Sequence, residues 1–511
     1  MIRRDGTCIS LWQDSVDEYY SLNRPQKNFL YDVIIVGGGI TGISTGLLLQ
    51  KAGKKCLIVE AANIGFGTTG GTTAHLNTLL DTPYTTIQKK FGKEDAKLVA
   101  KSVKEAIRLI YNNINEYRID CGFSFANAFL FAKDEKQEKE LDEIYEASVA
   151  AGIDIGYSDN ITVPIDFVKA VKVGGQGKFH PLKYVYGLAN EFEKMGGVIL
   201  QKCRVTNIEK NDTITAETEK GNFRANDLIY ATHIPPGVNL LHLRCVPYRS
   251  YAIAMTLNDN AYPADLAYDM YDPYHYYRTQ RVNGQNYLIA GGEDHKTGHE
   301  ENTEYSFLKL ESHIRQYFSV KEIVYKWSSQ YFEPADGIPY IGHLPGSPEN
   351  IYVATGFGGN GMVYSGVAAL VFKEILLNEE KKYADLFDPN RIKPIAGFTN
   401  FIKHNADVAK LFVSKLFSGE DLHELAELAP GEAKIVVYNK NKIALYKDEE
   451  GQLHAINPIC THLKCEVKWN MAEKTWDCPC HGARYSFDGK LLTGPASHDL
   501  ESIQLGSLIK K

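Results

Sequence analysis

The sequence lacks any apolar stretch of the roughly 18 residues that a membrane-spanning helix needs. The first residues, MIRRDGTCISLWQDSVDEYY, contain two arginines but no continuous apolar region, so we expect neither a secretory nor a twin-arginine signal. Basic residues are not in excess, because 56 Lys and Arg stand against 63 Asp and Glu, giving a net charge of −7. A negative chain has no long-range attraction for nucleic acid. We therefore expect a cytoplasmic protein with no nucleic-acid partner and no transmembrane segment.

Cysteine is sparse and unevenly distributed. Of nine cysteines in 511 residues, five are scattered without paired spacing: Cys8, Cys56, Cys121, Cys203 and Cys245. The other four lie between residues 460 and 480. Nine cysteines do not by themselves indicate an oxidising compartment, since most of them stand alone.

Two cysteines and two histidines are spaced as ligands of an iron-sulfur cluster. Cys460 and His462 are followed, after fifteen intervening residues, by Cys478 and His481. This pattern predicts a 2Fe-2S cluster in which one iron takes Cys460 and Cys478 and the other takes His462 and His481. A structural zinc site is the alternative, although Cys-His zinc fingers keep each ligand pair homogeneous, whereas each pair here is mixed.

The surrounding residues, from LAPGEAKIVVY to TGPASHDL, resemble the Rieske domain family over residues 420–508. The resemblance implies a disulfide between Cys465 and Cys480, as in the Rieske proteins of quinol-oxidising complexes, and a hydrogen bond from Tyr485 to a cluster sulfur. Ala483 replaces the family's serine, so one hydroxyl donor is missing and the reduction potential should fall short of the highest in the class. Gly494-Pro495-Ala496 matches the loop that shields the cluster from water.

A dinucleotide-binding pattern lies near the other end of the chain. The apolar run Asp32-Val33-Ile34-Ile35-Val36 leads into a turn with Gly37, Gly39 and Gly42, and a helix-like run follows. Strand, turn and helix in this order are the context that supports a GxGxxG motif. A second apolar strand ends in Glu60, 18 residues after Gly42, which suits a ribose hydroxyl. The motif alone leaves FAD and NAD open, and an ordinary glycine-rich turn is the structural alternative.

Three later segments resemble the FAD-dependent oxidoreductases of the D-amino-acid oxidase and glycine oxidase superfamily: residues 62–77, 203–233 and 333–362. Together with the first strand, the resemblance spans roughly residues 30–380. It implies FAD as cofactor, with contacts from Thr68, Thr69, Thr73, Val205, Gly356, Gly358, Gly359, Asn360, Gly361 and Met362. His75, within the first of these segments, is either a point of covalent flavin attachment or a packed or solvent-facing histidine.

These resemblances imply the domain organisation and the fold class. We expect an α/β and α+β oxidoreductase over residues 30–383, with a Rossmann-type FAD-binding domain (30–80, 180–235 and 330–383) and an interleaved antiparallel-sheet substrate domain (81–179 and 236–329). A helical linker over 384–419 and an all-β Rieske domain over 420–508 complete the chain.

Polar and aromatic residues in the expected sheet are candidates for the substrate pocket. We select Arg249, Tyr277 and Arg278, with Tyr248, His275 and Tyr276 as further candidates. An arginine could pair with a substrate carboxylate, but packed or surface roles are equally open. No motif places the superfamily's substrate arginine, so we assign no catalytic acid or base.

The two resemblances imply an FAD-dependent dehydrogenase. We expect an amine or amino acid to reduce FAD, and electrons to pass through the Rieske cluster to an external acceptor, either a protein or a quinone. An NAD(P)H-dependent reductase and a redox sensor without turnover are alternatives. An oxygenase would need a mononuclear iron site, for which the sequence shows no recognisable ligand set.

Overall fold

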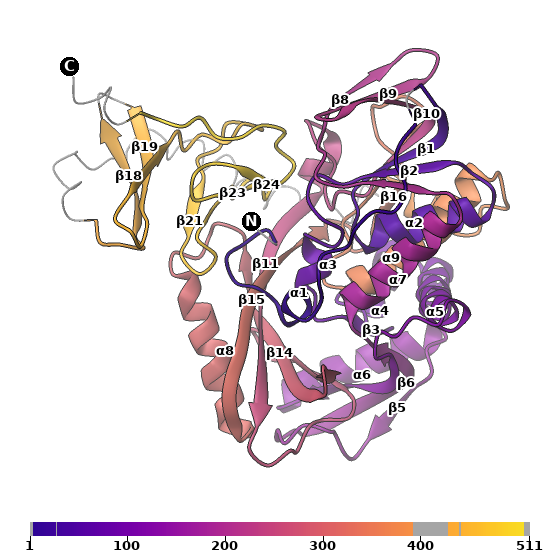
Figure 1. Ribbon diagram of the computed structural model, residues 1–511. Helices are drawn as coiled ribbons and strands as arrows, with labels where there is room; N and C mark the ends of the chain where they lie inside the picture. Colours follow the sequence, from indigo (N-terminus) through magenta and orange to yellow (C-terminus); the bar gives the residue numbers. More distant parts are fainter. Residues whose placement is uncertain (1–3, 27, 392–427, 439–440, 505–511) are drawn as a thin grey trace.

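The computed structural model of the protein describes residues 4–26, 28–391, 428–438 and 441–504. Two large sheets with their helices form the main body, and two small sheets form a separate C-terminal unit (Figure 1). Within these described ranges, no helix combines the length and the apolar character needed to cross a bilayer. Of the predicted linker over 384–419, the structure describes α10 (Ala384–Phe387) and the residues up to 391; the rest lies outside the described residues.

The first sheet has eight strands and a mainly parallel core. Its order is β16 (Tyr340–His343), β17 (Ile351–Thr355), β10 (Gly221–Tyr230), β1 (Leu30–Val36), β2 (Cys56–Val59) and β7 (Val198–Leu200). Strand β9 (Ile214–Thr218) pairs antiparallel with β10, and β8 (Val205–Lys210) pairs antiparallel with β9. The predicted strand and helix at the glycine-rich turn are confirmed as β1 and α2 (Ile40–Lys51).

Both faces of β1 are buried, because each is covered by a different layer. Val33 and Ile35 belong to the core shared with α2, α7 (Pro181–Lys194) and α9 (Gly361–Leu376). Ile34 and Val36 belong to the core on the β8–β9 side. A strand covered on both faces shows a continuous apolar run rather than alternation, as the sequence does here. Helix α5 (Lys93–Glu116) packs behind α9.

The second sheet is mixed and lies below the first in Figure 1. Its order is β15 (Val320–Pro334), β11 (Cys245–Leu257), β14 (Gln285–Lys296), β13 (His275–Val282), β12 (Leu266–Asp269), β4 (Ser124–Ala132), β6 (Lys169–Lys178) and β3 (His75–Leu76), with β5 (Ile155–Ser158) beside β6. Only the β4–β12 pairing is parallel within this described sheet. The sheet expected in the substrate domain is thereby confirmed, with this one parallel pairing in addition to the antiparallel ones.

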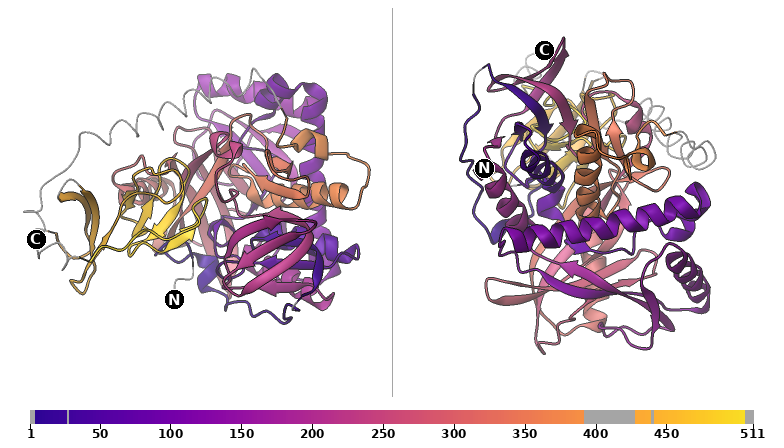
Figure 2. Two further views of the ribbon diagram at one scale, coloured as in Figure 1. Left: turned by 90° about the horizontal axis from the view of Figure 1, so that it is seen from above. Right: turned by 90° about the vertical axis from the view of Figure 1, so that its right-hand side faces the viewer.

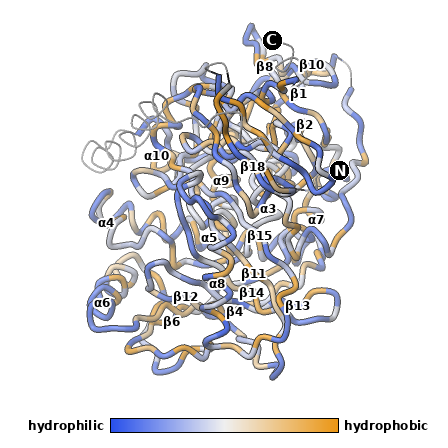
Figure 3. Tube along the Cα trace, turned by 90° about the vertical axis from the view of Figure 1, so that its left-hand side faces the viewer, coloured by the Kyte–Doolittle hydropathy of each residue, from blue (hydrophilic) through white to orange (hydrophobic). Residues whose placement is uncertain are grey.

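Helices cover the ends of the second sheet. Helix α8 (Thr303–Tyr317) packs against β11, β14 and β15, and α6 (Glu135–Ala150) packs against β4, β5 and β6. In Figure 3 most of the trace of α6 has the colour of hydrophilic residues. The remaining short elements are α1 (Leu11–Asp14), α3 (Thr68–Gly71), α4 (Tyr84–Phe91) and the 3-10 helix η1 (Leu240–Leu243).

The C-terminal unit is all β. One sheet contains β18 (Ala433–Tyr438), β19 (Asn441–Lys447) and β20 (Leu453–Ile456); the other contains β21 (Lys468–Asn470), β22 (Thr475–Asp477), β23 (Arg484–Ser486) and β24 (Leu491–Thr493). Figure 2 shows this unit projecting from one side of the main body, with the N-terminal residues beside it. The fold class expected from the sequence is thus confirmed in all three parts.

Buried charges join the N-terminal segment to the C-terminal unit. Arg4 forms an ion pair with Glu473 at 3.1 Å, and both side chains are almost fully buried. Glu473 also accepts hydrogen bonds from the backbone nitrogen of Ser328 at 2.8 Å and from its hydroxyl at 2.7 Å. Arg484 donates to the carbonyl oxygen of Asp5 at 2.8 Å. Three segments far apart in sequence therefore meet at one buried contact.

Candidate functional site

A cavity of about 680 Å³ lies between the two large sheets. Its walls come from the ends of β1, β2 and β10, the start of α9, the segment around α3, and the facing side of the second sheet. This is the size range of cofactor and substrate pockets. In open α/β sheets, ligands bind beyond the carboxyl ends of the parallel strands, which is where this cavity begins.

The glycine-rich turn has no room for side chains at Gly37 and Gly42. Gly37 has φ +114°, and a Cβ there would lie 2.4 Å from the carbonyl oxygen of Ala231. A Cβ on Gly42 would lie 1.9 Å from the carbonyl oxygen of Gly37, so Gly42 is required for helix packing and does not line the cavity. Gly37 and Gly39 do line it, next to the N-terminus of α2. The turn thus fits a pyrophosphate held by backbone amides.

Glu60 lies where a ribose hydroxyl acceptor was expected, at the end of β2. Its carboxylate accepts hydrogen bonds from the backbone nitrogens of Gly38 and Ala62, each at 2.7 Å. Burial raises the pKa of Glu60, whereas these two hydrogen bonds lower it. The side chain is therefore fixed at the cavity wall.

Most other residues predicted to contact FAD also line the cavity. These are Thr68, Thr69, Thr73, Val205, Gly358, Gly359, Asn360, Gly361 and Met362. Gly356 does not: it has φ +72°, and its Cβ position is 3.2 Å from Pro334, so it serves the turn before α9. Thr69 accepts from the backbone nitrogen of Ile40 at 3.0 Å, which ties α3 to the start of α2. The residues that line this cavity together fit an extended dinucleotide.

The four predicted cluster ligands come together in the C-terminal unit. The rings of His462 and His481 are 5.0 Å apart. Among the described residues, the Nδ1 atoms of both rings are buried without a hydrogen-bond partner. Contact with Cys478, opposed by burial, lowers the pKa of the Cys460 thiol to about 7. Two bare imidazole nitrogens and two adjacent sulfurs fit a 2Fe-2S cluster with mixed ligands.

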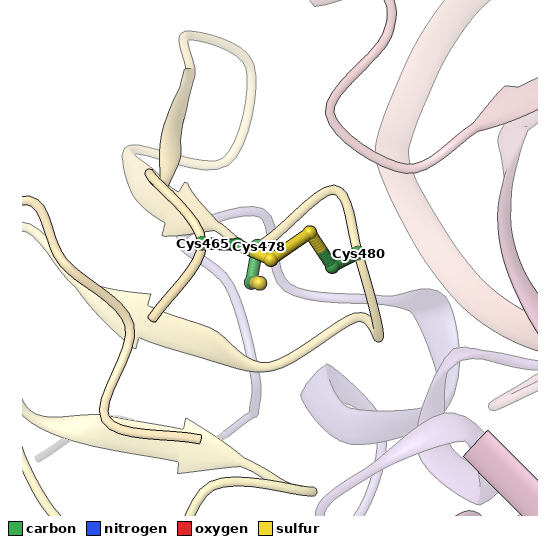
Figure 4. Close-up of side chains that lie close together, drawn as sticks. All are labelled: Cys465, Cys478 and Cys480. Carbon is green, nitrogen blue, oxygen red and sulfur yellow. A yellow bond between two sulfur atoms is a disulfide. The ribbon is translucent and has the colours of Figure 1, made fainter. Parts of the chain in front are cut away.

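The remaining cysteines of these loops form the expected disulfide. Cys465 and Cys480 are joined, and Cys478 lies beside the bond (Figure 4). Tyr485 places its hydroxyl 3.3 Å from the sulfur of Cys460, as the resemblance implied, while Ala483 is buried and offers no hydroxyl. One of the two hydroxyl donors of the resembled family is therefore present.

The cluster loops dock directly on the cavity. Gln330, which lines the cavity, donates from Nε2 to the carbonyl oxygen of Gly482 at 2.9 Å. Gly237 donates to the carbonyl oxygen of Pro495 at 3.2 Å. Five residues of the C-terminal unit form part of the cavity wall: Leu492, Thr493, Gly494, Ala496 and Ser497. The loop expected to shield the cluster therefore also borders the cofactor cavity.

His242 belongs to the same contact and carries no sequence signal. Its ring lies 4.6 Å from that of His462 and 5.6 Å from that of His481. Nε2 of His242 bonds to the carbonyl oxygen of Pro235 at 2.9 Å. Burial lowers the pKa of His242 to about 4, so a neutral ring packs between the two halves. No motif around residue 242 indicates this position.

Arg249 does not line the cavity. Successive side chains of a strand point to opposite faces, and Ser250 is the residue of this pair that lines it. The guanidinium of Arg249 lies 3.7 Å from Asp477 and donates to the hydroxyl of Ser328 at 3.0 Å. The geometry therefore places Arg249 in the contact with the C-terminal unit and does not support the predicted substrate role.

Tyr277 and Arg278 also lie outside the cavity wall. Tyr277 is on the face opposite Tyr276, and its hydroxyl lies 2.8 Å from Nε2 of His313 on α8. Arg278 is fully buried and donates to the backbone carbonyls of Thr73 at 2.8 Å and of Ala74 at 2.6 Å. Arg278 therefore holds the backbone of Thr73 and Ala74 in place next to the cavity. Of the further candidates, Tyr276 lines the cavity, whereas Tyr248 and His275 do not.

Several cavity residues were not predicted from the sequence. They include Asp81, Tyr268, Tyr274, Tyr331 and Glu333. His75 lines the cavity too, with Nδ1 2.7 Å from the hydroxyl of Tyr268. Glu333 is the first residue of the segment 333–362, which resembles a flavin-binding segment. Its position at the start of that segment is the one sequence feature that could have indicated a place near the flavin.

Comparisons with known proteins agree with both halves of the chain. The family model "FAD dependent oxidoreductase" (DAO) matches residues 32–375, and "Rieske [2Fe-2S] domain" matches residues 421–504. The fold of the first part is similar to a glycine oxidase from Geobacillus kaustophilus, with a TM-score of 0.58 at 18% identity, covering 71% of this chain and 99% of that one. L-proline dehydrogenase from P. horikoshii gives the same TM-score and identity, covering 71% and 97%.

Two relatives are similar in sequence. A Rieske 2Fe-2S iron-sulfur protein of Bacillus subtilis (strain 168), YhfW, is 32% identical over 497 residues, 97% of each chain. Gamma-glutamylputrescine oxidoreductase of Escherichia coli (strain K12) is 24% identical over 393 residues, 73% of this chain and 90% of that one. The chain therefore belongs to the DAO family of FAD-dependent oxidoreductases, and it carries a C-terminal Rieske domain, so that its cofactors are FAD and a 2Fe-2S cluster.

Proposed function

We propose that the protein is a dehydrogenase that oxidises an amine or amino acid and delivers the electrons to an external acceptor through its Rieske domain. The observation that carries this proposal is the docking of the cluster loops on the flavin cavity, through Gln330 and Gly482 and through Gly237 and Pro495. When bound, FAD takes an electron pair from a donor, and a 2Fe-2S cluster passes electrons on one at a time.

The residues that line the cavity would bind FAD in a defined order. Gly37, Gly39 and the start of α2 would hold the pyrophosphate, Glu60 the adenosine ribose, and Val205 the adenine. Thr68, Thr69 and Thr73 on one side, and Gly358, Gly359, Asn360, Gly361 and Met362 on the other, would surround the flavin end.

Cys460, Cys478, His462 and His481 would ligate the cluster, the histidines through Nδ1. The imidazoles are suited to this role because burial lowers the pKa of both rings, that of His481 to about 3. Neutral imidazoles are the form that binds a metal. The Cys465–Cys480 disulfide ties the two ligand loops together.

The donor class rests on the relatives. Gamma-glutamylputrescine oxidoreductase covers most of the flavin-binding part, and the solved structures of similar fold include a glycine oxidase and an L-proline dehydrogenase. These names agree in describing nitrogen-bearing substrates. We therefore favour an amine or amino acid over NAD(P)H, for which a second dinucleotide-binding motif is not recognisable in the sequence. We also propose a cytoplasmic location and a protein or quinone as acceptor.

The test is an anaerobic titration of the purified holoprotein. Amino acids, secondary amines, alkyl diamines and NAD(P)H are added in turn, while the flavin band is followed by visible absorption and the cluster by low-temperature EPR. We expect one nitrogen-bearing class to bleach the flavin, followed by an EPR signal with average g below 2. Bleaching by NAD(P)H alone would make the protein a reductase, and bleaching by no donor would favour a sensor.

A further inference from the structure

One end of the cavity is lined by tyrosines and carboxylates. This tyrosine end consists of Tyr274, Tyr276, Tyr331, Glu333 and Asp81. The rings of Tyr274 and Tyr276 are 5.8 Å apart. Asp81 accepts from the backbone nitrogen of Gly359 at 2.6 Å, which places this end next to the flavin-binding loop before α9.

Glu333 is exposed to the cavity, and the basic charge that acts on it is that of Lys296. Its side chain forms no hydrogen bond or ion pair with any residue that the structure describes, although it lines the pocket. Burial, and then the like charges of Asp81 and Asp294, raise the pKa of Glu333 to about 7, while Lys296 opposes the shift. A carboxylate in this position gains energy when a cation arrives.

Asp294 is a second carboxylate near this end, although it lies behind the wall and does not itself line the cavity. Its Oδ2 accepts from the hydroxyl of Tyr331 at 2.8 Å, but its Oδ1 is buried and has no hydrogen-bond partner among the described residues. Burial, aided by the charge of Asp81, raises the pKa of Asp294 to about 7. Asp294 therefore adds negative charge behind the tyrosine end without touching a molecule in the cavity.

Basic side chains are absent from the tyrosine end. Among the described residues of the whole cavity wall, Arg204 is the only arginine or lysine. Arg204 precedes Val205 and donates to the carbonyl oxygen of Leu491 at 3.1 Å, so it belongs to the part of the wall assigned to adenine. Arg249 and Arg278 are held elsewhere by Asp477 and by backbone carbonyls. A substrate carboxylate at the tyrosine end would meet Glu333 and Asp81, and no arginine or lysine of the described wall lies there to pair with it.

We propose that the substrate is a cationic aliphatic amine without a carboxylate, bound through its ammonium group by Glu333 within the tyrosine end. This inference rests on the proposed amine or amino acid dehydrogenase function and narrows it to amines. Tyrosine faces add to the recognition, since ammonium groups bind over aromatic rings. Amino acids are disfavoured because the carboxylate next to their nitrogen would face Glu333.

A matched pair of ligands separates charge from shape. The tert-butylammonium ion and pivalate share the same alkyl group, and neither can be oxidised by hydride removal, because the carbon next to the functional group carries no hydrogen. Calorimetric titration of the oxidised holoprotein should show binding of tert-butylammonium and none of pivalate. Glu333→Gln should weaken binding of the cation about tenfold, since it removes the carboxylate that would meet the ammonium group.

Control variants keep the result interpretable. Glu322→Gln changes an exposed carboxylate on the same strand, β15, and should leave the affinity unchanged. Asp294→Asn provides a second test that also weakens cation binding, and retained flavin absorption reports that each variant is folded. Preferential binding of pivalate, no binding of the cation at millimolar concentration, or equal affinity in wild type and Glu333→Gln would each overturn the proposal.

The donor titration then distinguishes this inference from the broader function. Bleaching by 1,4-diaminobutane but not by glycine supports both. Bleaching by glycine but not by 1,4-diaminobutane overturns the amine inference and leaves the dehydrogenase intact. Bleaching by neither counts against the dehydrogenase, whereas the calorimetric pair still reports separately whether the tyrosine end binds cations.

Discussion

His462 donates from Nε2 to the carbonyl oxygen of Gly237, 3.0 Å away, and so connects a proposed cluster ligand to the flavin-binding part of the chain. A neutral imidazole that donates from one ring nitrogen has its lone pair on the other. This contact therefore selects the tautomer with Nδ1 free to bind iron, which agrees with the lack of a hydrogen-bond partner for Nδ1 among the described residues. The main body of the protein thus orients a ligand in the C-terminal unit.

Replacing a cluster ligand should remove the cluster and leave FAD in place. We expect Cys478→Ser to abolish the Rieske EPR signal, with flavin content unchanged, because the FAD cavity wall does not include residue 478. His454→Gln is the matched control: His454 lies in the same unit but bonds to Asp448 at 2.9 Å, and its variant should keep the signal. Iron analysis and EPR on the same samples decide the matter. A full Rieske signal in Cys478→Ser would exclude this residue as a ligand.

Disturbing the docked loop should slow reduction of the cluster. Gly482 has φ +75°, and an added Cβ would lie 2.7 Å from Nε2 of Gln330 and 2.9 Å from Pro247. We expect Gly482→Ala to leave flavin bleaching by the donor unchanged and to delay the cluster signal, as followed by rapid mixing and freeze-quench EPR.

The control for Gly482 is Gly451→Ala. Gly451 has φ +83° but no atom within 4 Å of its Cβ position, so it carries a similar backbone cost without the contact. Equal cluster reduction rates in Gly482→Ala and Gly451→Ala would show that the Gln330–Gly482 contact does not set the rate.

The buried pair of Arg4 and Glu473 should make a large contribution to stability. Removing one partner of a buried ion pair leaves the other charge unpaired and costs about 3–5 kcal/mol. We expect Glu473→Gln to lower the urea concentration at which half of the C-terminal unit is denatured. The loss of the cluster's visible absorption measures this denaturation. Glu450→Gln, at an exposed position of that unit, should have almost no effect. Matching midpoints in the two variants would contradict this expectation.

Cation binding at the tyrosine end should depend on pH. Glu333 and Asp294, whose pKa values are raised to about 7, are largely protonated below that pH and ionised above it. Alkylammonium ions stay charged to about pH 10, so affinity for tert-butylammonium should rise between pH 6 and 8. Asp81 and Lys296 also act on Glu333, with opposite signs. In Glu333→Gln the rise should shrink; an identical rise in the variant would exclude Glu333 as its source.

Local patterns in the sequence predicted the fold and much of the candidate site. The turn from Gly37 to Gly42 is contiguous, and the cluster residues from Cys460 to His481 lie in two loops of one short stretch, so their geometry follows from short-range constraints. Arg249 was selected for its chemistry, but strand alternation directs it away from the cavity and toward Asp477. That partner lies more than two hundred residues away, and no local pattern could identify it.

The tyrosine end contains residues that line the cavity but that the sequence did not indicate. Glu333 and Asp294 come from different strands, and they become one charged group only through the pairing of β11 with both β14 and β15. Arg278 was chosen as a substrate residue, yet its guanidinium is used by the carbonyls of Thr73 and Ala74. Which polar residue faces a cavity depends on sheet register, and the sequence alone does not specify that register.

The contact of Arg4 with Glu473 also constrains the order of events during biosynthesis. The two residues are separated by 469 positions, so a ribosome that has made the first must translate most of the chain before the second exists. Domains fold as units during synthesis, and the flavin-binding part is therefore completed while the N-terminal segment still lacks its partner. The joint between the two redox halves can therefore form only after most of the chain has been synthesised.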